Sequence, residues 1–248
     1  MKEFWSGRIR DAVPYVPGEQ PREGKFIKLN TNECPYPPSP RVVEAIRQAA
    51  GDELRLYPDP ECLALRRAIA KREGLKPEQV FCSNGSDEVL AFAFQAFFDP
   101  EREIVFPRIT YSFYPVYTDY FGLRCRRVPM NPDFSDPVDE LCGSNGGVVL
   151  CNPNAPTGIA VPRTDIQRLL EADPDRVVIV DEAYVDFGGE SCVPLIDQYE
   201  NLLVVQTFSK SRQLAGARLG LAMGNAKLIA DLNRVKFSLN PYNINRLT

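Results

Sequence analysis

Short apolar runs alternate with helical patterns along most of the chain, and this alternation constrains the fold more than any other feature. Each run is continuous rather than alternating with polar residues, which is typical of strands buried on both faces. The expected strands span residues 80–83, 103–107, 123–128, 147–151, 176–180, 202–206 and 219–223. The pattern predicts an α/β fold with a mostly parallel central sheet and helices on both faces.

Start and stop signals place the helices between these strands. Ser39 is expected to cap a helix that runs to Ala50, and Asp59-Pro60 is expected to begin a helix that stops at Gly74. The other expected helices span residues 86–98, 111–121, 164–172 and 227–237. The residues before Ser39 are rich in Pro and Gly and are expected to form an extended arm.

Composition excludes several classes of protein. The chain of 248 residues has no His, so a Ser-His-Asp triad or a Cys/His pair is excluded, and proton transfer must use Lys, Tyr, Cys or a carboxylate. The 7 Cys are scattered without a CxxC pair, so reduced thiols and no metal site are expected. A net charge of −4 and the lack of a long apolar run argue against nucleic acid and membrane partners. The N-terminus lacks the apolar core of a secretory signal, so a cytoplasmic location is expected.

The residues that follow the strands are the candidates for a site, because ligands of parallel sheets gather at the carboxyl ends of strands. Asn84 to Asp87 follow the first strand and precede a helix, which fits either an ordinary helix cap or an anion site. Asp181 ends a buried run, and such a carboxylate needs a cation, a metal or several donors, unless it is an N-cap or part of a structural ion pair. Lys210 follows another strand among hydroxyls and glycines, and Arg218 comes eight residues later.

Together these segments resemble the fold-type-I pyridoxal-phosphate-dependent aminotransferases, and most closely the histidinol-phosphate aminotransferase family. The matching segments are Lys28 to Glu33, Leu56 to Pro60, Gly85 to Glu88, Asn154 to Gly158, Asp181 to Tyr184, Ser209-Lys210 and Leu214 to Gly220. The resemblance covers nearly the whole chain. It implies an N-terminal arm and the start of a small domain in residues 1–38, and a large cofactor-binding domain in residues 39–248. It also implies an incomplete small domain, with the arginine that binds the substrate carboxylate expected beyond Thr248.

The resemblance implies pyridoxal 5′-phosphate as the cofactor and assigns roles to the strand-end residues. Lys210 would form the Schiff base and move the proton at the substrate α-carbon. Asp181 would pair with the protonated pyridine nitrogen, and Tyr184 would hydrogen-bond the phenolic oxygen. The implied cofactor-binding residues also include the phosphate ligands and a stacking ring, and they are Gly85, Ser86, Asp87, Tyr111, Ser209 and Arg218.

Two further features of the resemblance concern Tyr57 and Ala155. Tyr57 would reach the cofactor phosphate of a partner subunit, which implies a homodimer with composite sites. Many relatives have Asn where this chain has Ala155, and that Asn bonds the phenolic oxygen. Asn154 or Asn152 is expected to supply the contact instead. Cys34 also stands where relatives commonly have a second Asn.

The family resemblance predicts transamination between histidinol phosphate and the glutamate/2-oxoglutarate pair in histidine biosynthesis. One alternative is decarboxylation of an amino-acid phosphate such as threonine phosphate. Another is a non-catalytic cofactor-binding scaffold, similar to the sensing domain of some transcription regulators. A Rossmann dehydrogenase is disfavoured because no G-x-G-x-x-G follows the first strand.

Overall fold

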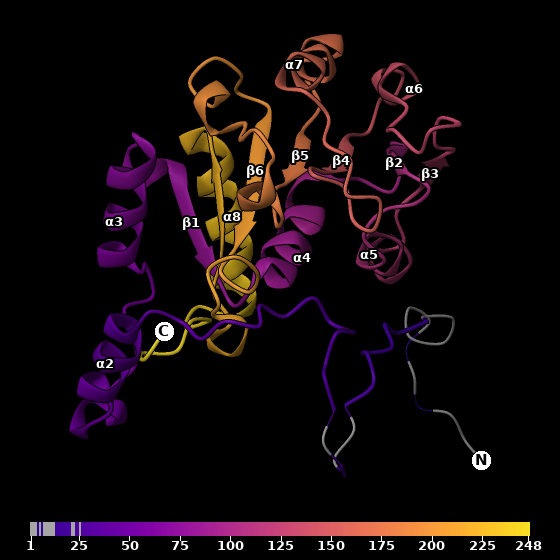
Figure 1. The fold of residues 1–248 in the computed structure, drawn as a ribbon. Coiled ribbons are helices and arrows are strands. Elements are labelled where there is room, and N and C mark those ends of the chain that lie inside the picture. Colours follow the sequence, from indigo (N-terminus) through magenta and orange to yellow (C-terminus); the bar gives the residue numbers. More distant parts are fainter. Residues whose placement is uncertain (1–3, 5, 7–12, 21–22, 25) are drawn as a thin grey trace.

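A computed structural model of the chain describes residues 4, 6, 13–20, 23–24 and 26–248 (Figure 1). None of the described residues before Pro40 lies in a helix or a strand. The division into an arm of residues 1–38 and a domain of residues 39–248 remains a prediction. In the described part of the chain, no helix has both the length and the apolar character needed to cross a membrane.

A seven-stranded sheet forms the centre of the fold, in the order β1-β7-β6-β5-β4-β2-β3. The strands are β1 (Val80–Ser83), β2 (Ile104–Pro107), β3 (Cys125–Val128), β4 (Val148–Cys151), β5 (Val178–Asp181), β6 (Leu202–Thr207) and β7 (Gly220–Gly224). Strand β7 runs antiparallel to both of its neighbours, and the other pairs are parallel. The prediction of a mostly parallel sheet is therefore confirmed.

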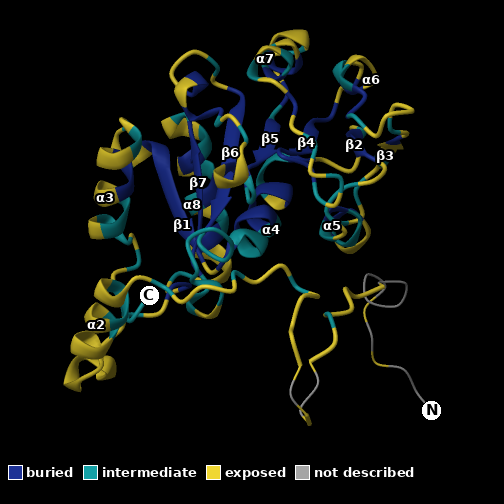
Figure 2. Cartoon of the chain, viewed as in Figure 1, coloured by how far each residue is buried: buried dark blue, intermediate teal, exposed yellow. Residues whose placement is uncertain are grey.

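Helices cover both faces of this sheet, as predicted. The α-helices are α2 (Pro40–Ala49), α3 (Leu63–Glu73), α4 (Ser86–Phe97), α5 (Phe113–Phe121), α6 (Val138–Cys142), α7 (Arg163–Ala172) and α8 (Ala226–Leu239). Short 3-10 turns span Asp52–Arg55, Pro77–Gln79, Val185–Phe187, Val193–Leu195 and Ala215–Ala217. Figure 2 shows buried strands at the centre and a largely exposed α2 at the margin.

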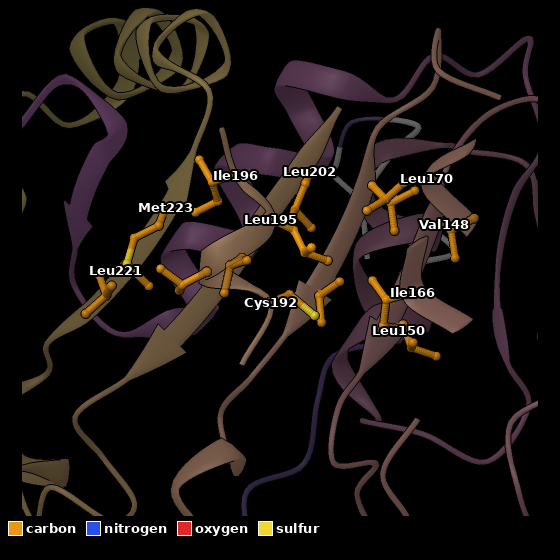
Figure 3. Packing of buried hydrophobic residues seen from close by; sticks show 14 of the residues in the cluster. Val148, Leu150, Ile166, Leu170, Cys192, Leu195, Ile196, Leu202, Leu221 and Met223 are labelled. Atoms are coloured by element: carbon orange, nitrogen blue, oxygen red, sulfur yellow. The ribbon is translucent and has the colours of Figure 1, made fainter. Parts of the chain in front are cut away.

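Alternate residues of the strands belong to two separate hydrophobic clusters. Val148 and Leu150 of β4 belong to a cluster that also contains residues of α3, α6 and α7, and Figure 3 shows them in this cluster with Ile166 of α7. Val149 belongs to the other cluster, with residues of α4, α5 and α8. Every strand except the edge strand β3 is buried along its whole length, which fits its largely apolar sequence.

The first two expected helices differ from the structure in detail. Helix α3 begins at Leu63 and not at Pro60, because the Asp59 carboxylate accepts hydrogen bonds from the N–H groups of Glu61 (3.0 Å) and Leu63 (2.8 Å) and holds a turn there. Ser39 precedes α2, but its side chain makes no capping hydrogen bond. Its carbonyl accepts the first bonds of that helix instead.

Candidate active site

The carboxyl ends of β4, β5 and β6 lie side by side, and the chain leaves all three in the same direction. Asp181 is the register partner of Cys151 on β4 and of Val205 on β6. A cavity of about 110 Å³ opens where these strands end. The predicted site residues that line it are Ser86, Asp87, Tyr111, Asp181, Tyr184, Ser209, Lys210 and Arg218.

One corner of the cavity is built for an anion. Gly85 precedes α4 with a φ of +83°, and a Cβ there would lie 2.4 Å from Nη2 of Arg218. A Cβ on Gly220 would lie 2.3 Å from the backbone N of Ser86, so two glycines let β7 approach the helix start. Arg218 Nη1 donates to Ser209 Oγ at 3.4 Å. The first N–H groups of a helix have no partner within the helix, so those at the start of α4 and the guanidinium together favour a phosphate.

Asp181 lies at the end of β5 and is only 2% exposed. Its Oδ2 accepts a hydrogen bond from the hydroxyl of Tyr114 (2.8 Å), and its Oδ1 accepts one from the N–H of Ala183 (3.1 Å). Burial raises the pKa of Asp181 to about 6, and these two hydrogen bonds oppose that rise. The carboxylate is therefore ionised at neutral pH and suited to a cationic partner in the cavity.

Lys210 and Tyr184 lie together and share contacts with an N-terminal segment. Lys210 Nζ lies 5.7 Å from the centroid of the Tyr184 ring and donates to the backbone oxygen of Thr31 at 3.2 Å. Asn32 Nδ2 donates to the Tyr184 hydroxyl at 3.0 Å. The sequence motifs included this segment but gave no role to Thr31 or Asn32, and nothing in their spacing shows that they contact residues so distant in the chain.

Tyr111 is held at the cavity by a hydrogen bond from its hydroxyl to Asp87 Oδ1 (2.8 Å). Burial, and then the nearby Asp87 carboxylate, raise the pKa of Tyr111 far above its usual value, so the hydroxyl remains protonated. Its ring packs against Phe113, with centroids 5.7 Å apart. Stacking of Tyr111 on a cofactor ring remains a prediction.

Gly85 adjoins this cavity through Arg218 without lining it, and two other predicted site residues lie farther from it. Tyr57 is 78% exposed, and its ring stacks on Tyr242 with centroids 4.6 Å apart. Asn154 lines a neighbouring cavity of about 300 Å³, which Asn32 and Tyr184 also line. Tyr184 therefore borders both cavities.

Comparison with known proteins gives the family. The sequence model described as "Aminotransferase class I and II" matches residues 24–241. A histidinol-phosphate aminotransferase from Clostridium acetobutylicum is 54% identical over 247 residues, which are 100% of this chain and 70% of that protein. Another, from Acetobacter pasteurianus, is 58% identical over 100% of this chain and 69% of that protein. The chain belongs to the histidinol-phosphate aminotransferase family.

Solved structures agree with this family. A putative histidinol-phosphate aminotransferase from Erwinia carotovora atroseptica superposes with a TM-score of 0.80 and 28% identity, over 88% of this chain and 65% of that one. Histidinol-phosphate aminotransferase from Sinorhizobium meliloti, solved in complex with pyridoxal 5′-phosphate, gives 0.79 and 27%, over 88% of this chain and 60% of that one. The chain thus spans about 70% of the curated relatives and less of these two structures.

Pyridoxal 5′-phosphate is the cofactor of this family, and the cavity fits it. The corner at Gly85, where a Cβ would meet the Arg218 guanidinium, suits the phosphate. The buried Asp181 carboxylate suits the protonated ring nitrogen, and the Lys210 amine lines the same cavity. Which atoms each residue would contact remains a prediction.

Proposed function

We propose that the chain acts in transfer of an amino group between histidinol phosphate and the glutamate/2-oxoglutarate pair, in histidine biosynthesis. The observation that carries the proposal is one cavity that combines the Lys210 amine, the buried Asp181 carboxylate and the Arg218 guanidinium. The names of the similar curated proteins support the substrate. They also favour amino-group transfer over decarboxylation of an amino-acid phosphate.

The residues of the cavity divide the chemistry among them. Bound pyridoxal phosphate supplies an electron sink for the bonds of the substrate α-carbon. Lys210 would take the proton from the α-carbon of the amino donor and, in the second half-reaction, give a proton to the corresponding carbon of the acceptor, a task for which an amine at the cavity wall is suited. Asp181 would hold the proton on the ring nitrogen, and Ser209 and Arg218 would fix the phosphate.

We also propose a homodimer in which Tyr57 contacts the partner subunit's cofactor. The Tyr57 ring lies outside the cavity of its own chain and is exposed, as are its neighbours Leu54 (52%) and Leu56 (46%). This exposed group supports a contact with another subunit. Sedimentation of the protein across a range of concentrations tests the dimer, and a monomer at all of them would contradict it. A cytoplasmic location remains a prediction.

The function is tested by the visible absorbance of the purified protein with added pyridoxal phosphate. We expect an absorbance band in the parent protein that Lys210→Ala abolishes, since Lys210 would join the cofactor covalently. Lys227→Ala, which changes an exposed lysine at the start of α8, is the matched control and should keep the band. A band that persists in Lys210→Ala would contradict the assignment.

The substrate is tested separately. The protein is supplied with histidinol phosphate and 2-oxoglutarate, and glutamate is measured. In parallel it is supplied with threonine phosphate, and carbon dioxide is measured. Glutamate production without carbon dioxide release is expected, and the reverse result would select the decarboxylase.

A further inference from the structure

The loop that follows β4 offers no accessible amide donor to replace the contact that Ala155 cannot make. Asn154 Nδ2 donates to the backbone oxygen of Ile109 (2.9 Å) and to Thr157 Oγ1 (3.1 Å), so both of its N–H groups are in use. Asn152 is 1% exposed, and its amide exchanges two hydrogen bonds with the backbone of Val161 (3.0 and 2.9 Å). Asn154 therefore has no N–H left for the phenolic oxygen of the cofactor, and Asn152 is buried and lines neither cavity.

Asn32 brings an amide to the same place from the other side. Asn32, Ala155 and Tyr184 line the cavity of about 300 Å³ together. Asn32 Nδ2 donates to the Tyr184 hydroxyl at 3.0 Å. A phenol has one proton and can also accept. Because Tyr184 accepts from Asn32, its own proton is left for a different acceptor. Tyr184 also lines the cavity of about 110 Å³ that contains Lys210, called the Lys210 cavity below.

The backbone holds Asn32 in this position. Asn32 has a φ of +52°, a left-handed conformation that Asn tolerates better than most residues. The preceding residue, Thr31, accepts the hydrogen bond from Lys210 Nζ (3.2 Å) through its backbone oxygen. Thr31 and Asn32 therefore contact Lys210 and Tyr184 respectively, and these contacts restrict the positions of the Lys210 and Tyr184 side chains.

We infer that Asn32 is a positioning residue, whose amide orients the Tyr184 hydroxyl so that its proton points to the phenolic oxygen of pyridoxal phosphate. The bond from Asn32 through Tyr184 would take the place of the direct amide contact that the family resemblance implies at the position of Ala155. A hydroxyl that accepts one hydrogen bond is also a stronger donor in the next one. This inference rests on the proposed function, because it requires the cofactor in the Lys210 cavity.

The test is a pH titration of the visible absorbance of the protein loaded with pyridoxal phosphate. Hydrogen bonds to the phenolic oxygen favour the deprotonated form of the chromophore, so their loss moves the midpoint to higher pH. We expect Asn32→Gly, which suits a positive φ, to raise the midpoint by about half to one pH unit. Asn30→Gly is the matched control, since the Asn30 amide bonds the backbone oxygen of Glu19 and should leave the midpoint unchanged.

A double-variant cycle separates positioning from a general structural effect. In a Tyr184→Phe protein, Asn32→Gly should add no further shift, because there is no hydroxyl left to orient. Ala155→Asn should return the midpoint of Asn32→Gly toward the parent value by restoring the direct amide. An equal shift in both backgrounds, or no shift with Tyr184 present, overturns the inference.

Further outcomes keep the inference distinct from the proposed function. If Asn32→Gly does not fold, as judged by circular dichroism, the near-isosteric Asn32→Asp replaces it. A carboxylate there can only accept, so the shift should be larger with Tyr184 than with Phe at that position, and equal shifts overturn the inference. If the parent protein shows its absorbance band but the double-variant cycle shows no coupling between Asn32 and Tyr184, the role of Asn32 is contradicted and the proposed function is not. No band in the parent protein contradicts the proposed function and this inference with it.

Discussion

Two buried aspartates have opposite surroundings. Asp181, at the end of β5, accepts hydrogen bonds from Tyr114 and Ala183 and faces the Lys210 cavity. Asp136, just before α6, is 6% exposed and lines a different hollow, of about 320 Å³. Neither oxygen of Asp136 has a hydrogen-bond partner among the described residues. Burial raises the pKa of Asp136 to about 7 and the pKa of Asp181 to about 6.

The contrast shows what keeps a buried carboxylate charged. Asp181 is the more deeply buried of the two, yet its pKa is the lower one. Hydrogen bonds to the ionised form offset part of the desolvation cost at Asp181, and Asp136 has no such compensation. Around neutral pH, Asp181 therefore holds a negative charge for a cation to meet, whereas Asp136 is divided between its two forms.

Replacing each aspartate by Asn should give the largest difference between them. Asp181→Asn removes the charge that would hold the ring nitrogen protonated, and we expect turnover to fall on the order of a thousandfold. Asp136→Asn lies outside the Lys210 cavity and should leave turnover nearly unchanged. Both are measured with saturating pyridoxal phosphate. Similar losses in the two variants would mean that the charge of Asp181 has no special role.

The stability of the fold should respond to pH through Asp136. Its folded-state pKa of about 7 lies above the ordinary value of 3.8, so its contribution is full below pH 3.8 and is lost as the pH rises through 7. We expect the free energy of unfolding of Asp136→Asn, relative to that of the parent, to rise by about 3 kcal/mol between pH 5 and pH 8. Urea unfolding of both proteins at pH 5 and at pH 8 measures this change. If the stability difference between variant and parent is the same at both pH values, Asp136 has a hydrogen-bond partner in solution.

A smaller effect is expected from the donor to Asp181. Tyr114→Phe removes one hydrogen bond to the carboxylate, which should raise the pKa of Asp181 further. The Asp181 charge is then lost at a higher pH as acid is added. The pH at which cofactor binding is lost on acidification should rise by about one unit. The absorbance of the loaded protein measures this pH. No change in this pH would indicate that the hydrogen bond from Ala183 is sufficient by itself.

The sheet and the edge that carries the site were predictable, and many of the contacts within the site were not. Continuous apolar runs located the strands because strands buried on both faces need apolar residues at every position. The short α6 was not predicted, since its 5 residues are too few to show a helical period. Asn32 and Tyr184 lie 152 residues apart, and Tyr114 and Asp181 lie 67 apart. Contacts at such separations depend on tertiary structure, which single-sequence patterns do not record.

The two glycines at the phosphate corner also bear on the order in which the protein can assemble. Strand β1 pairs with β7 alone, and Gly220 at the start of β7 packs against the backbone that joins β1 to α4. During synthesis β1 emerges first among the strands and β7 last. The corner therefore cannot close until the final strand has left the ribosome, and long-range pairing of this kind is slow to form. Cofactor capture would then have to wait until every strand of this sheet has been synthesised.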